Sequence, residues 1–215
     1  MGLKDWRWEP AGMELVRETH PLNPRVLVSG WAARVRNLED GRRQIIGLIL
    51  PGEGIGICRR PQPLALCPVI ALTPIQTLDA RPLVTAIADP VTHGALSAAV
   101  DVAGAMDEAW LMDQIVRLGR LTAYERLAHL IMELHSRLRA LGMETEGSLP
   151  FPLTQEMLAD ATGLSMVHVN RTLQQLRRDK LIEVGQGKLK VHDLEALRDI
   201  ADFREPRPNS WEFKH

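Results

Sequence analysis

The chain has 215 residues, and 26 lysines and arginines nearly balance 27 aspartates and glutamates, giving a formal net charge of −1. This balance excludes a protein that coats nucleic acid indiscriminately, so any affinity for DNA must be local. Two cysteines are too few for a four-cysteine metal site, and we predict no metal or cofactor. The sequence has no long apolar run, which predicts a cytoplasmic protein with no membrane partner.

The first 89 residues contain most of the prolines, between short β-rich runs and turn signals. One run at residues 26–28 leads past Gly30 into a strand at 31–36. Residues 39–41 then supply a turn, and residues 43–50 return as the partner strand. Two further short strands are expected at 69–72 and 75–78. We therefore predict an all-β sensor unit over residues 1–89, without helices.

Proline then disappears, and Ala, Leu, Met and charged residues dominate at helical spacing. A long helix is expected to run to about residue 118. Its small residues, including Gly104 and Ala109, would let a second helix approach closely, so residues 90–120 are predicted to form a dimerisation helix. The alternative is that its apolar stripe packs on the β unit of its own chain. The stripe consists of Leu96, Ala99, Ala103, Met106 and Trp110.

Gly119 is expected to break this helix, and a capping box of Thr122 and Glu125 begins the next one. Gly142 ends that helix, and residues 144–150 are predicted to be a linker. We assign residues 121–215 to one C-terminal unit. The buried face of the helix is expected to hold Leu127, Leu130, Ile131, Leu134, Leu138 and Leu141.

Two short helices joined by a glycine turn follow. Thr154 is expected to cap a helix over residues 155–161, and Ser165 to cap a second helix after the turn at 162–164. Val169, Leu173 and Leu176 recur at the spacing of a buried face. This pattern is typical of a helix-turn-helix.

The second of these helices has a polar, basic face. Residues 165–190 hold six basic and two acidic side chains, a local charge of +4. Arg171 can donate two hydrogen bonds to guanine, Asn170 or Gln174 could bind adenine, and Met166 or Val167 could contact a thymine methyl group. The alternative is a solvated charged face. The predicted DNA-binding residues are Thr154, Gln155, Ser165, Met166, Val167, His168, Asn170, Arg171, Gln174 and Lys188.

A hairpin is predicted next, with strands at 181–184 and 189–191 around a glycine turn at 185–188. The motif is therefore winged, and Lys188 and Lys190 are placed to contact phosphates. A final helix is expected within residues 193–203. The tail at 204–215 is predicted to be anchored by Trp211 or Phe213.

Several strings resemble the cyclic-AMP receptor/fumarate-nitrate regulator (Crp/Fnr) family of bacterial transcription factors. They are LTAYERLA at 121–128, LTQEMLA at 153–159 and GLSMVHVNRTL at 163–173, with looser matches SGWAA at 29–33, DGRRQ at 40–44 and LPGE at 50–53. The resemblance implies an α+β fold with an N-terminal cyclic-nucleotide-binding-like β-roll, a long dimerisation helix and a C-terminal winged helix-turn-helix. It also implies a homodimer, not an enzyme, that binds a palindromic operator in double-stranded DNA, with RNA polymerase as a candidate partner.

The chain departs from this family at two places. The family's base-reading arginine falls on Arg171, but a neighbouring position that is often glutamate falls on Val167, which favours a thymine methyl over cytosine. Members that bind cyclic nucleotides carry a glutamate for the ribose and an arginine followed by serine or threonine for the phosphate. Here Ile57 and Cys58 stand near the first position, and Leu66 and Cys67 near the second. We therefore predict a degenerate sensor that does not bind cyclic AMP, because the phosphate would lack a partner.

The effector is not identified by these residues. Three other hypotheses for the sensor stay open, namely an anionic ligand held by Arg59 and Arg60, a redox pair of Cys58 and Cys67 as opposed to two apolar thiols, and haem ligation by His20 or His93. The alternative to a DNA-binding regulator is a small-molecule or redox sensor whose winged helix is a protein-interaction surface.

Overall fold

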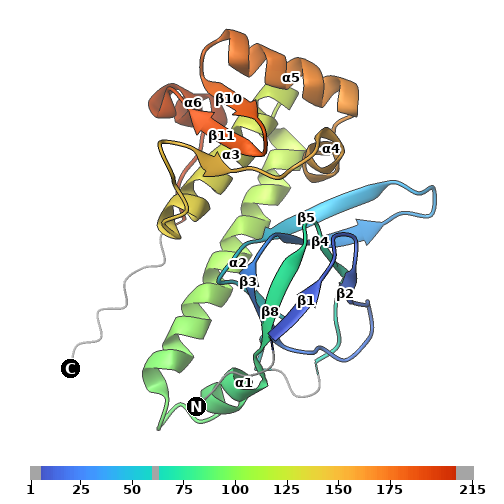
Figure 1. Cartoon of the computed structure of the whole chain (residues 1–215), viewed down its shortest axis with the longest axis vertical. Helices are drawn as coiled ribbons and strands as arrows, with labels where there is room; N and C mark the ends of the chain where they lie inside the picture. Colours follow the sequence, from blue (N-terminus) through green and yellow to red (C-terminus); the bar gives the residue numbers. More distant parts are fainter. Residues whose placement is uncertain (1–5, 60–62, 207–215) are drawn as a thin grey trace.

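A long helix, α2 (Gly94–Arg120), connects the two ends of the molecule (Figure 1). The computed structural model describes residues 6–59 and 63–206. A β-roll lies along one side of α2, and a unit of short helices and a small sheet lies at the carboxyl end of α2. The order of a β unit, a long helix and a winged helix-turn-helix confirms the predicted α+β fold class.

The β-roll consists of two four-stranded antiparallel sheets. The strands predicted around residues 26–28, 31–36, 43–50, 69–72 and 75–78 are all present. The first sheet has the order β1 (Trp6–Glu9), β8 (Ile75–Asp79), β3 (Arg25–Ser29) and β6 (Gly54–Ile55). The second has the order β2 (Glu14–Val16), β7 (Val69–Ala71), β4 (Ala32–Asn37) and β5 (Arg43–Ile49).

Gly30 marks the corner where the chain leaves the first sheet for the second. Its backbone φ is +79°, and a Cβ atom there would lie 2.2 Å from the carbonyl oxygen of Pro74. Any other residue would therefore force the corner to open.

The prediction of a helix-free N-terminal unit is wrong at its end. Helix α1 (Arg81–Ile87) follows β8 directly and has a proline in its first turn, Pro82. Proline fits there because the first turn leaves its backbone N–H groups unpaired in any case. The carboxylate of Asp79 accepts a hydrogen bond from the backbone N–H of Arg81 at 2.9 Å, at the start of the helix.

Helix α3 (Ala123–Ala140) begins at the predicted capping box: Thr122 accepts from the N–H of Glu125, and Glu125 accepts from the N–H of Thr122. Helix α2 ends at Arg120, two residues beyond the predicted end, because Gly119 continues the helix and Leu121 is the first extended residue. The predicted linker ends in a short strand, β9 (Leu149–Pro150).

The C-terminal unit contains α4 (Gln155–Thr162), α5 (Met166–Arg178), the hairpin β10 (Ile182–Gly185) and β11 (Lys188–Val191), and α6 (Leu194–Ala201). Strand β9 pairs with β11, so the wing is a three-stranded sheet. The predicted anchors Trp211 and Phe213 lie outside the described residues.

One buried cluster extends from the β-roll into the C-terminal unit. It runs from Val35 and Ile45 through Leu127 and Leu134 of α3 to Leu173 of α5. A second cluster, which includes Leu27 and Ile55, fills the space between the two sheets. Across residues 6–59 and 63–206, none of the helices is both long and apolar enough for a membrane span.

Candidate nucleic-acid interface

Helices α4 and α5 are joined by the tight turn that the sequence predicts. Thr154 caps α4 by accepting from the N–H of Met157 at 3.2 Å, and Ser165 caps α5 by accepting from the N–H of His168 at 3.3 Å. Gly163 ends α4 in the left-handed conformation, with φ +65°. These caps satisfy backbone groups that helix ends leave unpaired, and they fix where α5 begins.

The buried side of α5 packs against α3 and α4. Val169, Leu173 and Leu176 are almost completely buried, as predicted. Because these residues recur at intervals of three and four, the opposite face of α5 is turned outward. Of the predicted site residues, Asn170 is half-buried and the other nine are exposed.

The outward face of α5 has partly fixed and partly free side chains. The Asn170 amide donates to Gln155 Oε1 at 3.3 Å, and His168 Nδ1 lies 3.0 Å from Ser165 Oγ. Within the described part of the chain, Arg171 has no hydrogen-bond or ion-pair partner. A free guanidinium on an exposed helix face retains all its donors for an external acceptor.

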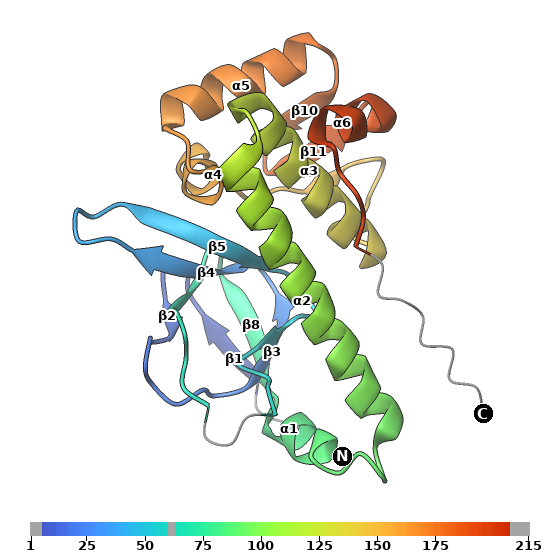
Figure 2. The ribbon, with the colours of Figure 1, turned by 180° about the vertical axis from the view of Figure 1, so that it is seen from behind.

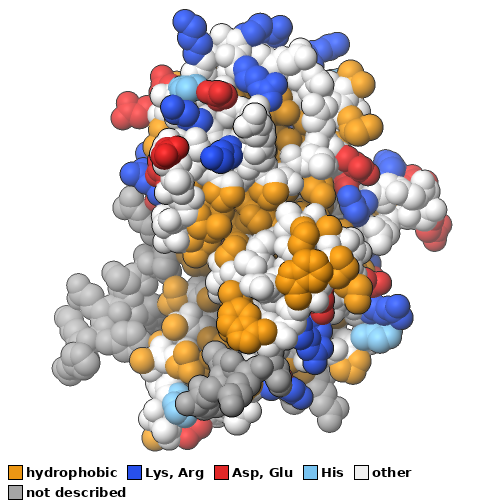
Figure 3. All heavy atoms as spheres, in the orientation of Figure 1, with side chains coloured by type: hydrophobic (Ala, Val, Ile, Leu, Met, Phe, Trp, Pro, Cys, Tyr) orange, Lys and Arg blue, Asp and Glu red, His pale blue; other side chains and the backbone are white. Residues whose placement is uncertain are grey.

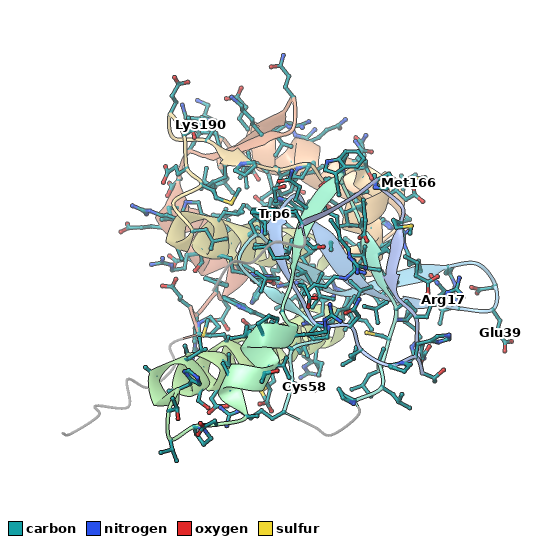
Figure 4. The ribbon with its side chains drawn as sticks, turned by 60° about the horizontal axis from the view of Figure 1, so that its bottom comes forward. Trp6, Arg17, Glu39, Cys58, Met166 and Lys190 are labelled. Carbon is teal, nitrogen blue, oxygen red and sulfur yellow. The ribbon has the colours of Figure 1, made fainter. Side chains whose placement is uncertain are left out.

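The wing lies beside α5 and carries two exposed lysines, Lys188 and Lys190. Its turn uses two left-handed residues, Gln186 with φ +51° and Gly187 with φ +71°. Arg177 is not available to a ligand in the same way, because its guanidinium donates to the carbonyl of Val184 at 2.8 Å. Figure 4 shows Met166 and Lys190 on opposite sides of the C-terminal unit.

Positive charge gathers on this unit. Lysine and arginine side chains stand out over the end of the molecule that carries α5 and the wing (Figure 3). Asp179, one of the two acidic residues between positions 165 and 190, accepts a hydrogen bond from the hydroxyl of Tyr124 at 2.6 Å. Burial and this carboxylate raise the pKa of Tyr124 to about 12, so the tyrosine remains a neutral donor. The local excess of positive charge suits phosphate groups.

The carboxyl end of α4 is held by the rest of the molecule. Arg43 of β5 forms an ion pair with the Asp160 carboxylate at 2.7 Å. Each of the last three α4 carbonyls accepts from a different element: Asp160 O from Gln44 of β5 at 2.6 Å, Ala161 O from Gln114 of α2 at 2.7 Å, and Thr162 O from Arg126 of α3 at 3.2 Å. The helix-turn-helix is thereby fixed to the β-roll and to both long helices.

A buried ion cluster connects the same three elements. Glu133 of α3 accepts from Arg117 of α2 and from Arg137 at 2.6 Å. Arg137 also binds the Glu53 carboxylate of the β-roll at 2.7 Å. Burial opposes ionisation of Glu133, but the two guanidinium groups hold the pKa of this carboxyl below its usual value. Removing one partner would leave an unpaired buried charge, which is strongly destabilising.

His129 completes this cluster as a neutral acceptor. Its Nδ1 lies 3.0 Å from Arg117 Nη2, and its ring packs edge-on against Phe203. Burial and the nearby Arg117 charge lower the pKa of His129 to about 4.

We expect this histidine to make folding sensitive to acid. The unfolded chain binds a proton at His129 with a pKa near 6.5, whereas the folded chain does so only near 4, so protons favour unfolding between these values. The free energy of unfolding should fall by about 2 kcal/mol from this group between pH 7 and pH 5. Urea titrations at both pH values measure the loss. His129→Gln, which keeps an acceptor, should show a correspondingly smaller pH effect; an equal pH effect in both proteins would contradict the assignment.

The structure divides the stripe predicted for dimerisation. Leu96, Ala99 and Ala103 are exposed and Met106 is half-buried. Trp110 instead contacts its own chain, where it stacks on Phe203 with ring centroids 6.4 Å apart and lies beneath the Arg137 guanidinium. The sequence left open whether this stripe pairs with a second copy or packs within its own chain. Trp110 packs within its own chain.

A different face of α2 is apolar and uncovered. Figure 2 shows α2 running past the roll with its outer side open. Three large residues on it, Val102, Met112 and Val116, are 41%, 56% and 50% exposed. With small residues between them they form a seam spaced alternately by three and four: Ala95, Ala98, Val102, Ala105, Ala109, Met112 and Val116. This spacing is typical of paired helices.

The residues considered for a sensor have ordinary surroundings. Arg59 is engaged by α2, since it donates to Ser97 Oγ at 2.6 Å and to Asp101 at 3.0 Å. Arg60 lies outside the described residues. Cys58 and Cys67 are half-buried free thiols. His20 and His93 are exposed, and no cluster of three or more metal-ligating side chains occurs in the described ranges.

Two small pockets are also present. One, between β5, α2 and α3, has a volume of about 20 Å³ and borders the buried ion cluster. The other, about 10 Å³, is lined by Arg7, Asn23, Arg25, Thr77 and Asp79. The larger has room for one water molecule, and neither has room for a nucleotide.

Comparison with known proteins gives a match to a family model in the second half of the chain and relatives that align with most of it. Residues 125–200 match the model of the Crp-like helix-turn-helix domain. The chain is 32% identical over 182 residues to the transcriptional activator protein FnrL of Cereibacter sphaeroides, covering 81% of this chain and 71% of FnrL. It is 27% identical over 164 residues to the nitrogen fixation regulation protein FixK of Bradyrhizobium diazoefficiens, covering 76% of this chain and 68% of FixK.

The fold is also similar to solved structures. FixK2 from Bradyrhizobium japonicum superposes with a TM-score of 0.77 over 91% of this chain and 96% of FixK2, at 24% identity. The CRP-family regulator TTHB099 from Thermus thermophilus gives a TM-score of 0.67 over 92% of this chain and 97% of that regulator, at 19% identity. At these identities, the likeness to the solved structures concerns the fold.

Proposed function

Because the chain belongs to the Crp/Fnr family of transcription regulators, we propose that it acts as a homodimer that binds a twofold-symmetric DNA operator through helix α5 of each copy. The family consists of DNA-binding transcription factors, and the chain is accordingly a DNA-binding regulator and not an enzyme. RNA polymerase is a further proposed partner. The proposed location is the cytoplasm, because the DNA is there.

The observation that carries the assignment of α5 is its exposed, basic outer face. Arg171 lies on this face without a partner among the described residues, while the caps at Thr154 and Ser165 fix the two helix starts. Arg171 is proposed to bind guanine O6 and N7, and Asn170 or Gln174 to bind adenine. Thr154, Gln155, Ser165, His168 and Lys188 are proposed to position the unit on the phosphate backbone.

Pairing through α2 supplies the twofold symmetry. The seam centred on Val102, Ala109 and Val116 is proposed to pack against the same seam of a second copy, with Leu96, Ala99 and Ala103 at its flank. Its small residues allow close approach of the two helices. Two α5 helices about 34 Å apart would then enter successive major grooves on one face of the duplex.

The β-roll is proposed to be a sensor that does not bind cyclic AMP. Ile57, Cys58, Leu66 and Cys67 offer no arginine or carboxylate for the cyclic phosphate and ribose. Arg59 is already bound to α2, and apolar side chains fill the space between the two sheets. We retain the division into a sensor at 1–89, a pairing helix at 90–120 and a DNA-binding unit at 121–215.

The salt dependence of DNA binding tests this function. Affinity for promoter fragments should fall steeply as salt rises, because each neutralised phosphate releases counterions. Lys188→Ala should weaken binding to all sequences alike and reduce the slope of log affinity against log salt by about two for a dimer, one unit per copy. Fluorescence anisotropy at four salt concentrations measures both quantities.

The alternative function predicts a different result. If the winged unit were a protein-interaction surface, DNA affinity would be weak and its salt slope would not change with Lys188→Ala. That outcome would contradict the assignment of the wing to phosphate contact.

A further inference from the structure

The first turn of α5 exposes two large apolar side chains. Met166 is 57% exposed and Val167 is 69% exposed, at the end of the helix where the Ser165 cap fixes the backbone. An apolar side chain gains free energy when a partner covers it, and the gain is roughly proportional to the area removed from water. Val167, four residues before Arg171, stands on the face that carries Arg171, and Met166 lies beside Val167 in the first turn.

This part of the face has no carboxylate to accept from a base. The first turn of α5 contains no acidic residue. The nearby polar side chains are partly committed, since His168 Nδ1 contacts Ser165 Oγ and the Asn170 amide donates to Gln155. An exposed cytosine amino group would find no strong acceptor at Val167, whereas the C5 methyl of thymine would find an apolar surface.

Val167 is in register with Arg171. Residues four apart lie one above the other on a helix, separated by about 6 Å along its axis. Adjacent base pairs are about 3.4 Å apart along each strand. A guanine bound by Arg171 therefore places Val167 over a base pair one or two steps away.

Resting on the proposed DNA-binding function, we propose that Val167, flanked by Met166, is a methyl-reading site that selects a thymine one or two base pairs from the guanine bound by Arg171. The ligand group is the C5 methyl in the major groove. Because 5-methylcytosine carries the same methyl at the same position, it should be bound in place of thymine. Cytosine methylation would then create binding sites for this regulator.

The test uses the full chain and an operator duplex selected from a random DNA pool. The thymines of each half-site are replaced by deoxyuridine, which lacks only the methyl group, one symmetric pair at a time. One buried methyl corresponds to about a fourfold change in affinity, so replacement in both half-sites should weaken binding about 15-fold at one position. At that position, 5-methylcytosine should bind about 15-fold more tightly than cytosine.

Two variants separate this role from a structural one. Val167→Ala should bind the thymine and deoxyuridine duplexes equally, while it still requires the guanine. Val167→Glu should prefer cytosine to thymine, because glutamate accepts from the cytosine amino group. Gln175→Ala, an exposed change on the same helix outside the proposed contacts, is the matched control and should keep the methyl effect of about 15-fold.

The outcomes distinguish the two proposals. Equal affinity of the unaltered chain for thymine and deoxyuridine at every position, with binding that still depends on Arg171, would overturn the methyl-reading site and leave the regulator function standing. A methyl effect that survives Val167→Ala would also overturn it. Binding that no duplex sequence improves would overturn both.

Discussion

Replacing Arg171 with alanine is expected to abolish sequence discrimination while leaving non-specific DNA binding nearly intact. Arg171 is the one arginine in the middle of the outer face of α5, and within the described chain it has no partner that would hold it away from DNA. A bidentate arginine–guanine contact contributes about 1–3 kcal/mol of discrimination, and a dimer makes two such contacts. The ratio of specific to non-specific affinity should therefore fall by about 30-fold to more than 1,000-fold.

Two other substitutions control for this result. Arg171→Lys keeps the charge but loses the two-pronged geometry, so it should retain non-specific binding and lose most of the discrimination. Lys188→Ala should lower both affinities together. Competition titrations with an operator duplex and a scrambled duplex measure each ratio. If the alanine variants at 171 and 188 behaved identically, the separate roles of base reading and phosphate contact would be wrong.

Placing a charge in the α2 seam is expected to give monomers that no longer hold an operator. Met112→Asp or Val116→Asp would bring two carboxylates together where two apolar side chains are proposed to meet. Linking two binding units increases overall affinity by about 10²–10⁴-fold without any new contact, and a monomer loses that factor. Sedimentation velocity gives the oligomeric state, and anisotropy with one-half-site and two-half-site duplexes gives the loss of affinity.

The control for this variant is Val91→Asp. Val91 is 95% exposed and lies outside the proposed seam, so the same chemical change there should leave both assembly and DNA binding unaltered. Because Met112 and Val116 are themselves at least half exposed, the charged variants should fold, which circular dichroism checks. Variants that remained dimeric and bound the operator normally would show that α2 does not pair through this face.

The helix-turn-helix could be predicted because its determinants are local. Thr154 and Ser165 each fix a helix start through the backbone N–H three residues later, and Gly163 ends α4 through its bond to the carbonyl of Ala159, so short spacings are sufficient evidence. The buried face of α5 follows from the same short-range periodicity. The turn of the wing, with Gly187 in the left-handed conformation, is local in the same sense.

The structural features that could not be predicted from the sequence depend on residues far apart in the chain. Strands β1, β2 and β6 are short and acquire their pairing from strands far along the chain, as with Trp6 opposite Leu78. The hydrogen bond from the Gln44 side chain to the Asp160 carbonyl at the end of α4 likewise spans 116 residues. Sequence periodicity does not predict such a pair, because Gln44 alone resembles an ordinary surface residue.

Helix α2 shows why apolar patterns on a long helix are ambiguous. The stripe ending at Trp110 and the seam through Val102, Met112 and Val116 have the same spacing and lie on different faces. The packing of Trp110 on Phe203 decides between them at the carboxyl half, and Phe203 lies 93 residues further along the chain. Only tertiary contact distinguishes the face used within the chain from the face left open.

Selection of bound sites from a random DNA pool tests whether a dimer of this chain binds a symmetric operator, because it examines the partner, its symmetry and its spacing together. We expect a palindromic motif with a guanine in each half-site and half-site centres about 10 base pairs apart. Sequencing that returned no enriched motif, or a single asymmetric site bound by one copy of the chain, would contradict it.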